Sequence, residues 1–430
     1  MKFSGKIASS EFLINTATLI GGTSIAQVLP LIFAPLISRL FSTDDFSVYG
    51  VFVSIYAILG TVITLRYEPA VMLPDDDRKS LDVVFLSLFS SLLLTILFFV
   101  IVVLFKYPIA GLFNIERTDA FWLILVPPAA FFLAANNILI TWFNRKKQYK
   151  TISANRIVRN GLLTGSNIGL GFAKTGFFGL ILSQIISDCI AALYYLSVFF
   201  RKALPSGFTL KKKNLIAVGS EYRDFPKFVL PSTFVDTVSA QLPILLIAAL
   251  YSKELSGSYF FAFRILAIPI AVIGSAFAQT FYQKFVASVH SSDFEGALRF
   301  MKRSWLLLAS IIIVPALLLL GAGEPLFAFI FGNEWTESGK IASVLILYIM
   351  FAFVSSPTST TYIALGMQKY NLIFSLIVIS YRFLAIYTGY LMNNFYLGLY
   401  MLVCCEMLEI VIYNAVVYKK MKQLIQSNKQ

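Results

Sequence analysis

Charged side chains interrupt several long apolar segments of this 430-residue chain. A charge near the centre of a bilayer costs about 2.5–3.5 kcal/mol on insertion scales, so each one needs a partner, a cavity or a function. The cations are mainly arginines, which stay charged at any working pH and can bind phosphate through two parallel hydrogen bonds. If they face one cavity, they suit an anionic group such as a pyrophosphate. The candidates are Arg66, Arg156, Arg159, Lys227, Arg264 and Arg382.

Acidic side chains lie in the same apolar segments. Transfer out of water disfavours the charged form of a carboxyl group, so a buried acid can take up and release a proton. We therefore expect some of these acids to carry a coupling ion. The residues do not distinguish a proton from a sodium ion. The candidates are Glu68, Asp188, Asp236, Glu406 and Glu409.

Some of these charges also allow a purely structural interpretation. Arg66 and Glu68 are close in sequence near one end of an apolar segment, where an interfacial ion pair can reach the lipid headgroups. Arg156 and Arg159 lie one helical turn apart and therefore on one face, from which both can extend towards the headgroups. For charges deeper in their segments, the cost of burial in the membrane favours a functional role. These are Asp236, Arg264 and Arg382.

The segments that carry these charges are long enough to span a membrane as helices. The chain is 58% hydrophobic and 13% charged, whereas soluble domains average about 25% charged residues. A spanning helix needs about 20 mostly apolar residues, and β-barrel strands would be shorter and would alternate in polarity. We predict an all-α integral membrane protein with about twelve spans. The predicted spans are 12–37, 46–72, 81–105, 120–143, 152–172, 177–200, 225–250, 257–281, 304–320, 341–365, 371–392 and 395–418.

Basic residues concentrate in the loops on one side of the predicted spans. By the positive-inside rule, these loops and both termini are cytoplasmic. The net charge of +13 comes mainly from this asymmetry. Because the cations are spread over many short loops, we expect contact with membrane lipids and not with nucleic acid. The basic loops include residues 145–150, 201–213, 299–303 and 419–422.

A basic segment in the middle of the chain divides the spans into two sets of six. We predict a six-helix lobe at 1–205, a cytoplasmic linker at 206–222 and a second six-helix lobe at 223–430. An even number of spans in each lobe allows a parallel repeat, and a short match between 24–30 and 239–243 supports one. Two similar lobes around a central cavity suit a transporter that moves one lobe against the other.

Side chains suited to enzymatic chemistry are scarce. His290 is the single histidine and lies in a predicted loop, and the three cysteines lie in predicted spans. Neither a zinc site nor a disulfide framework is therefore expected. The chain contains no Walker A phosphate loop, so ATP hydrolysis is not expected either. We predict a protein that is not an enzyme and that needs no cofactor or metal.

Short motifs follow one another in a characteristic order along the chain. The first half contains GGTSIAQ at 21–27, PLISRLF at 35–41 and TLRYE at 64–68. The second half contains PKF at 226–228 and QLP at 241–243. In this order and spacing the motifs resemble Wzx-type polysaccharide flippases of the MOP exporter superfamily. Further matches at 259–264 and 331–340 extend the resemblance over nearly the whole chain.

The resemblance implies two six-helix lobes facing a central cavity that opens alternately to each side of the membrane. It implies transfer of undecaprenyl-pyrophosphate-linked oligosaccharide units from the cytoplasmic to the outer leaflet of a bacterial inner membrane, for O-antigen or capsule synthesis. A polysaccharide polymerase and a chain-length regulator would be further partners. Arg66, Lys227 and Arg264 match the cationic cavity of that family. The candidates for contact with sugar are Gln27, Gln241 and Tyr259.

Two other functions stay open at this point. A multidrug or cation antiporter of the same fold would favour acidic and aromatic groups in its cavity, whereas cations predominate among the buried charges here. A membrane polysaccharide polymerase would be expected to have larger outer loops or a histidine in a span, and the predicted spans contain no histidine. The flippase is therefore the function that the sequence favours.

Overall fold

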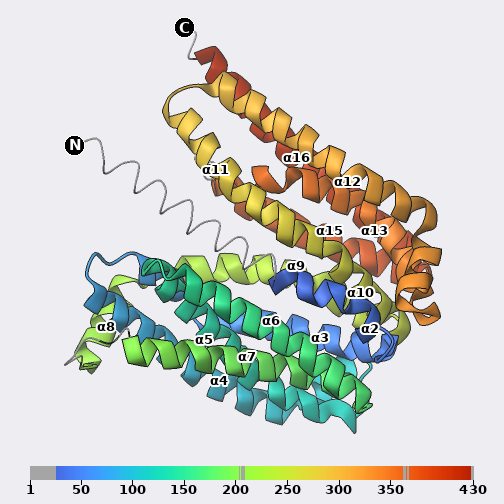
Figure 1. Ribbon diagram of the computed structural model, residues 1–430, viewed down its shortest axis with the longest axis horizontal. Helices are drawn as coiled ribbons and strands as arrows, with labels where there is room; N and C mark the ends of the chain where they lie inside the picture. The colour runs from blue at the N-terminus through green and yellow to red at the C-terminus, as the bar shows by residue number, and fades with distance from the viewer. Residues whose placement is uncertain (1–25, 203, 205–208, 362–364, 366–367, 428–430) are drawn as a thin grey trace. The chain divides into compact units, whose positions relative to one another are not determined.

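Helices make up all the regular structure in the part of the chain that the computed structural model describes (Figure 1). The helices group into two compact units, Met1–Gln241 and Leu242–Gln430. This architecture confirms the predicted all-α fold class. The described residues are 26–202, 204, 209–361, 365 and 368–427.

The first unit is built from long helices that lie side by side, with shorter turns between them (Figure 1). Helix α5 packs against α3, α4 and α7, and α6 packs against α7. The helices are α2 (Ala34–Ile37), α3 (Thr43–Ile63), α4 (Asp77–Leu112), α5 (Val126–Arg145), α6 (Tyr149–Phe172), α7 (Phe177–Lys202), α8 (Lys212–Glu221) and α9 (Leu230–Leu250), joined in part by the turns η1 (Glu68–Met72), η2 (Asp119–Leu125) and η3 (Phe225–Val229). Helix α9 contains the boundary between the units.

The second unit has the same kind of construction. Helix α13 packs against α10, α12 and α16, and α15 packs against α16. The elements are α10 (Lys253–Pro269), η4 (Ile270–Gly274), α11 (Ser275–His290), α12 (Phe294–Phe331), η5 (Asn333–Trp335), α13 (Thr336–Ser355), η6 (Ser356–Thr360), α15 (Gln368–Leu391) and α16 (Phe395–Ser427).

Ten helices in the described part of the chain are long and apolar enough to cross a membrane. Two of the predicted spans are not among the ten. The first, 12–37, lies mostly outside the described residues. The fifth corresponds to α6, which is 24 residues long but carries arginine and asparagine side chains along its length. Large apolar side chains such as Phe89, Leu104 and Leu306 are exposed, as lipid-facing surfaces require. The chain is a multi-pass membrane protein.

The predicted span 46–72 is too long. Helix α3 ends at Ile63, and Leu65 and Arg66 then adopt left-handed backbone conformations, with φ of 50° and 55°. A left-handed non-glycine residue costs about 1–3 kcal/mol, so two in a row strain the backbone where the chain changes direction. Arg66 consequently lies in the break between α3 and η1, and Glu68 is the first residue of η1, so neither is on the long helix as the sequence suggests.

Part of the predicted linker 206–222 forms helix α8, which packs against α4. Glu221 on α8 accepts a hydrogen bond of 2.6 Å from the Lys79 ammonium, and this bond lowers the pKa of the Glu221 carboxyl. The Tyr67 hydroxyl donates to the Gly219 carbonyl at 3.3 Å. Val218 joins the apolar core of the first unit. The division into lobes at 1–205 and 223–430 stays a prediction.

Two short segments, η3 and η4, have π-helical hydrogen bonding. Each lies beside proline: Pro226 is inside η3, and Pro269 directly precedes η4. Proline removes a backbone donor and clashes with the preceding turn, so the helix accommodates it with a wider turn. Because of η4, the segment from α10 to α11 is a single irregular helix and not one straight span.

Candidate functional site

A buried carboxylate on α7 organises a polar cluster inside the first unit. Asp188 has no exposed surface, and its carboxylate accepts hydrogen bonds from the Arg159 guanidinium on α6 and the Tyr56 hydroxyl on α3. The Gln184 side-chain amide donates to the same carboxylate at 2.8 Å. Three partners in a low-dielectric interior offset the cost of burying the charge. The carboxylate therefore has a fixed orientation.

A second layer of contacts holds the partners of Asp188. The Tyr49 hydroxyl donates to Gln184 at 2.9 Å. The Asn136 side chain on α5 donates at 2.9 Å to the backbone carbonyl of Asp188. The Arg159 side chain is 33% exposed, whereas Asp188 is fully enclosed. The guanidinium is thus anchored at Nε by Asp188 and at Nη2 by Tyr56, while part of the Arg159 side chain stays exposed.

The second unit contains an ion pair of the same type. Arg382 on α15 contacts Glu406 on α16 through two hydrogen bonds, Nε to Oε1 at 2.6 Å and Nη2 to Oε2 at 3.1 Å. Tyr259 on α10 and Tyr348 on α13 lie within electrostatic range of both charges. Tyr259 is buried and stacks on Phe263. Such a bidentate pair fixes both side chains.

The two clusters use corresponding elements. In order along the chain, Tyr56, Asn136, Arg159 and Asp188 lie on the second, fourth, fifth and sixth predicted spans. Their counterparts lie on the eighth, tenth, eleventh and twelfth. The two clusters thus use spans of the same rank in the two predicted sets of six, and the parallel repeat stays a prediction. The counterparts are Tyr259, Tyr348, Arg382 and Glu406.

A third ion pair joins the break after α3 to the first residue of η1. Arg66 Nη1 lies 2.5 Å from Glu68 Oε1, and the Glu68 side chain is almost fully buried. Among the described groups, neither Arg66 Nε nor Glu68 Oε2 has a hydrogen-bond partner. An unused buried donor next to an unused buried acceptor is costly, and a bound polar ligand would satisfy both.

The other predicted cations and Asp236 have varied surroundings. Arg156 is half-buried, one turn before Arg159 on α6. Lys227 is exposed in η3, with its ammonium 5.0 Å from the centre of the Phe228 ring. Arg264 is half-buried on α10, and Asp236 is exposed on α9.

The three candidates for contact with sugar also differ. Gln27 Oε1 is buried and has no hydrogen-bond partner among the described groups. Gln241 is engaged, since its side-chain oxygen accepts a hydrogen bond of 3.1 Å from the Ser54 hydroxyl. Tyr259 belongs to the cluster around Arg382. Gln27 therefore has the clearest unused hydrogen-bonding capacity of the three.

The structure thus pairs cations and acids that the sequence assigned to separate tasks. It joins Arg159 to Asp188 and Arg382 to Glu406, so neither arginine is an isolated cation. Sequence reasoning missed the groups around these pairs. Helical spacing contained a signal for some of them, because Gln184 lies four residues before Asp188 and hence on the same face. The other missed groups are Tyr49, Tyr56, Asn136, Tyr348 and Tyr381.

Sequence comparison relates the chain to proteins of polysaccharide synthesis. The family described as "Polysaccharide biosynthesis protein" matches residues 36–340. The teichuronic acid biosynthesis protein TuaB of Bacillus subtilis (strain 168) is 21% identical over 312 residues. That alignment covers 71% of this chain and 61% of TuaB, so the chain spans less than two thirds of this relative.

Structural comparison relates the fold to membrane proteins of the MOP superfamily. An inward-facing multidrug resistance MATE family transporter of that superfamily matches with a TM-score of 0.67 and 14% identity, over 95% of each chain. The lipid II flippase MurJ, in an inward closed conformation, matches with a TM-score of 0.69 and 14% identity. The match covers 96% of this chain and 89% of MurJ. At these identities the likeness establishes the fold, which is the predicted MATE-like MOP fold.

Proposed function

Because the chain belongs to the polysaccharide biosynthesis protein family, we propose that it moves undecaprenyl-pyrophosphate-linked oligosaccharide units across a membrane. Transfer runs from the cytoplasmic to the outer leaflet of a bacterial inner membrane, by alternating access, and serves O-antigen or capsule synthesis. Both termini are then cytoplasmic. The observation that carries the proposal is the anchored arginine in each unit, Arg159 and Arg382, held by a buried carboxylate in a fold of the MOP type.

An anchored arginine suits the pyrophosphate of such a substrate. A guanidinium has five N–H donors, and the ion pair with Asp188 uses only some of the five donors of Arg159. Because the carboxylate already fixes its orientation, little side-chain entropy is lost when its remaining N–H donors bind phosphate. Arg66 offers an unpartnered buried Nε as a further donor. The proposed phosphate-binding residues are Arg66, Arg156, Arg159, Lys227, Arg264 and Arg382.

The sugar portion needs hydrogen-bonding groups and flat apolar surfaces. In this proposal Gln27 binds a sugar hydroxyl through its unpartnered side-chain oxygen. Gln241 and Tyr259 complete the sugar contacts, and Gln241 would exchange its hydrogen bond with Ser54 for one with sugar. The prenyl chain stays in the surrounding lipid.

Among the acidic candidates, Glu409 is the best suited to carry a coupling proton. Protonation of Asp188 or Glu406 would break a buried ion pair, which is costly. Glu409 is half-buried one turn after Glu406. Within the described residues no cation lies at ion-pair distance from it, so its protonation breaks no such contact. Glu68 is also paired, and Asp236 is exposed, so both rank below Glu409.

A drug antiporter is the second candidate, because one similar fold is that of a MATE transporter. The partly exposed Arg159 side chain opposes it, since a guanidinium in the path of a cationic drug disfavours its binding. A polysaccharide polymerase would act on substrate that has already been transferred. The three functions therefore predict different distributions of the lipid-linked substrate between the leaflets.

The test is a bacterial strain that lacks this gene, in which lipid-linked oligosaccharide is quantified by mass spectrometry and assigned to a leaflet. Complete units trapped on the cytoplasmic face, with surface polymer lost, support the proposal. An unchanged pool with increased drug sensitivity would favour the antiporter, and a pool stranded on the outer face would favour the polymerase.

Complementation of that strain with variants of this protein tests the proposed phosphate-binding cations. Arg264→Ala should abolish transfer, whereas Arg264→Lys should retain part of it because the charge remains. Lys213→Ala, which removes an exposed cation at the start of α8, is the matched control and should transfer normally. Normal transfer by a stably expressed Arg264→Ala protein would refute a role for this charge.

A further inference from the structure

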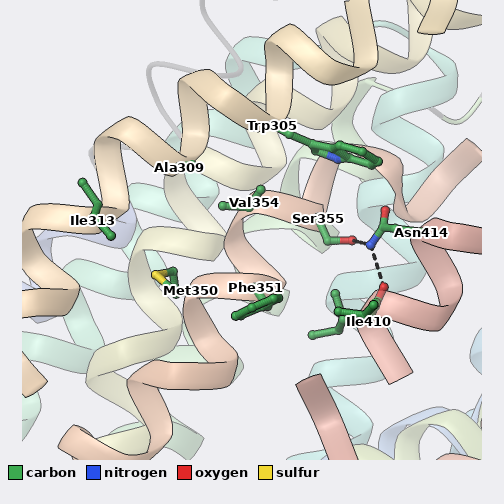
Figure 2. A pocket seen from close by; sticks show the side chains of 10 residues that line it. Trp305, Ala309, Ile313, Met350, Phe351, Val354, Ser355, Ile410 and Asn414 are labelled. Atoms are coloured by element: carbon green, nitrogen blue, oxygen red, sulfur yellow. Dashed lines mark hydrogen bonds between the residues drawn. The ribbon is translucent and has the colours of Figure 1, made fainter. Parts of the chain in front are cut away.

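The second unit contains an apolar groove that the proposed transport reaction does not use. Side chains of helices α12, α13 and α16 line an open groove with a volume of about 440 Å³. Figure 2 shows these side chains. This volume is within the range of about 300–1,000 Å³ that is typical of ligand pockets. The lining is Trp305, Ala309, Ile313, Met350, Phe351, Val354, Ser355, Ile410, Val411 and Asn414.

The polar groups of this lining lie together at one end, where Trp305, Ser355 and Asn414 are close to one another (Figure 2). The Asn414 side-chain nitrogen donates to the Ser355 hydroxyl and to the Ile410 carbonyl, each at 2.7 Å (Figure 2). The Asn414 side-chain oxygen accepts from Thr358 at 2.8 Å. The indole N–H of Trp305 has no hydrogen-bond partner among the described groups. Because that nitrogen is itself buried and Asn414 is fully engaged, the surface of the groove is almost entirely apolar.

Two residue stripes continue from the groove to a basic end. On α16, Ile410, Asn414, Tyr418 and Lys422 follow at intervals of four residues and so lie on one face. On α12 the corresponding stripe is Ile313, Ala309, Trp305 and Lys302. The stripes meet at Tyr418, whose ring centre lies 5.2 Å from the Lys302 ammonium and 5.0 Å from the Lys422 ammonium.

We infer that this groove binds one hydrocarbon chain of an anionic membrane phospholipid, whose phosphate group contacts Lys302 and Lys422. In a bilayer, an open apolar groove is filled by hydrocarbon, because no water is present to fill it. Two lysines at one end select a negative headgroup. The positive-inside prediction puts this end at the cytoplasmic leaflet.

The size of the groove favours a phospholipid over the prenyl chain of the proposed substrate. A volume of about 440 Å³ suits a single acyl chain, whereas an undecaprenyl chain is several times larger. The site lies entirely within the second unit, and none of its residues belongs to the cluster around Arg382. The inference therefore stands whether or not the proposed transport reaction is correct.

Tryptophan fluorescence provides the test, because Trp305 is the one tryptophan that is not fully buried; Trp122, Trp142 and Trp335 are at most 1% exposed. The full-length protein is reconstituted into vesicles that contain phosphatidylglycerol or phosphatidylcholine with brominated acyl chains, which quench nearby indoles. The signal of Trp305 is the difference between the native protein and Trp305→Phe. We expect brominated phosphatidylglycerol to quench this signal at a lower mole fraction than brominated phosphatidylcholine.

Charge variants distinguish a specific phospholipid site from a general attraction of anionic lipids to the basic surface. Lys302→Ala with Lys422→Ala should weaken the preference for phosphatidylglycerol about thirtyfold, from about 1 kcal/mol for each basic residue at a membrane surface. Arg303→Ala with Lys419→Ala removes the same charge from exposed positions on the same helices, one residue after Lys302 and three residues before Lys422, and should change little. If both double variants lose the preference for phosphatidylglycerol equally, the preference comes from surface charge in general, and the proposed site is wrong.

Two further outcomes would also overturn the inference. Equal quenching by both lipids in the native protein would mean that bulk hydrocarbon fills the groove without selection. Displacement of the brominated phospholipid by undecaprenyl phosphate at a lower mole fraction would assign the groove to the prenyl chain instead. Ala309→Phe, which fills the groove but leaves both lysines in place, should abolish the selective quenching if the acyl chain lies there.

Discussion

Gly389 and Gly398 face each other where α15 and α16 pack together. A Cβ atom on Gly389 would lie only 2.7 Å from the Cα of Gly398. Small residues allow the backbones of membrane helices to come this close. Arg382 and Glu406 lie about two turns from this contact, one on each helix, so the close approach also sets the distance across which their ion pair forms.

Gly389→Ala should therefore destabilise the second unit by about 1–3 kcal/mol, because the added methyl group meets backbone that cannot rotate away. The thermal unfolding midpoint in detergent measures this effect. Gly321→Ala on α12 is the control, since a Cβ atom there has nothing within 4 Å. Equal midpoints for both variants would contradict the tight contact.

Loss of one partner of the pair in the first unit should cost more than loss of both. Arg159→Leu leaves Asp188 buried without its cation and should lower the free energy of unfolding by about 3–5 kcal/mol. Arg159→Leu combined with Asp188→Asn should recover much of this loss. Denaturant or thermal unfolding of the native protein, the single variant and the double variant measures both changes. A double variant as unstable as the single one would show that the unpaired carboxylate is not the main cause.

The variant that combines Arg159→Leu with Asp188→Asn should regain stability without regaining transport. If the guanidinium of Arg159 binds phosphate, the double variant folds but does not complement the deletion strain. Full complementation would remove Arg159 from the proposed substrate site while leaving its structural role intact.

Arg382→Lys should not substitute for arginine. The pair with Glu406 is bidentate, and an ammonium cannot make two parallel hydrogen bonds in a fixed plane. We expect Arg382→Lys to lower the unfolding midpoint measurably but less than Arg382→Ala, because the charge is retained. A midpoint for Arg382→Lys equal to that of the native protein would mean that charge alone, without the planar geometry, stabilises this pair.

Acid should release helix α8 in a way that depends on Glu221. The bond from Lys79 lowers the Glu221 pKa, so its contribution is complete above the ordinary glutamate value of about 4.3 and is lost as pH falls through the lower value. Amide hydrogen exchange of α8, corrected for the intrinsic effect of pH, should accelerate in that acidic range. In Glu221→Gln this pH dependence should be absent, and an unchanged profile would exclude Glu221 as its source.

The sequence was sufficient to predict the helical membrane fold, because long apolar segments leave few alternatives in a bilayer. It also located Arg382 and Glu406 on neighbouring spans. It could not pair them, since pairing depends on helix rotation and on close contacts such as that of Gly389. The end of α3 was equally hidden: Leu65 and Arg66 adopt left-handed conformations without a glycine to indicate a turn.

The pairing of charges has a consequence for the response to the membrane potential. Moving one unit charge across 100 mV involves about 2.3 kcal/mol, so unpaired arginines that moved with a lobe would act as voltage sensors. Arg159 with Asp188, and Arg382 with Glu406, each move as a dipole with no net charge. These pairs therefore contribute no net gating charge, and any dependence of the transport rate on voltage must come from the other charges in the spans, the coupling ion or the substrate.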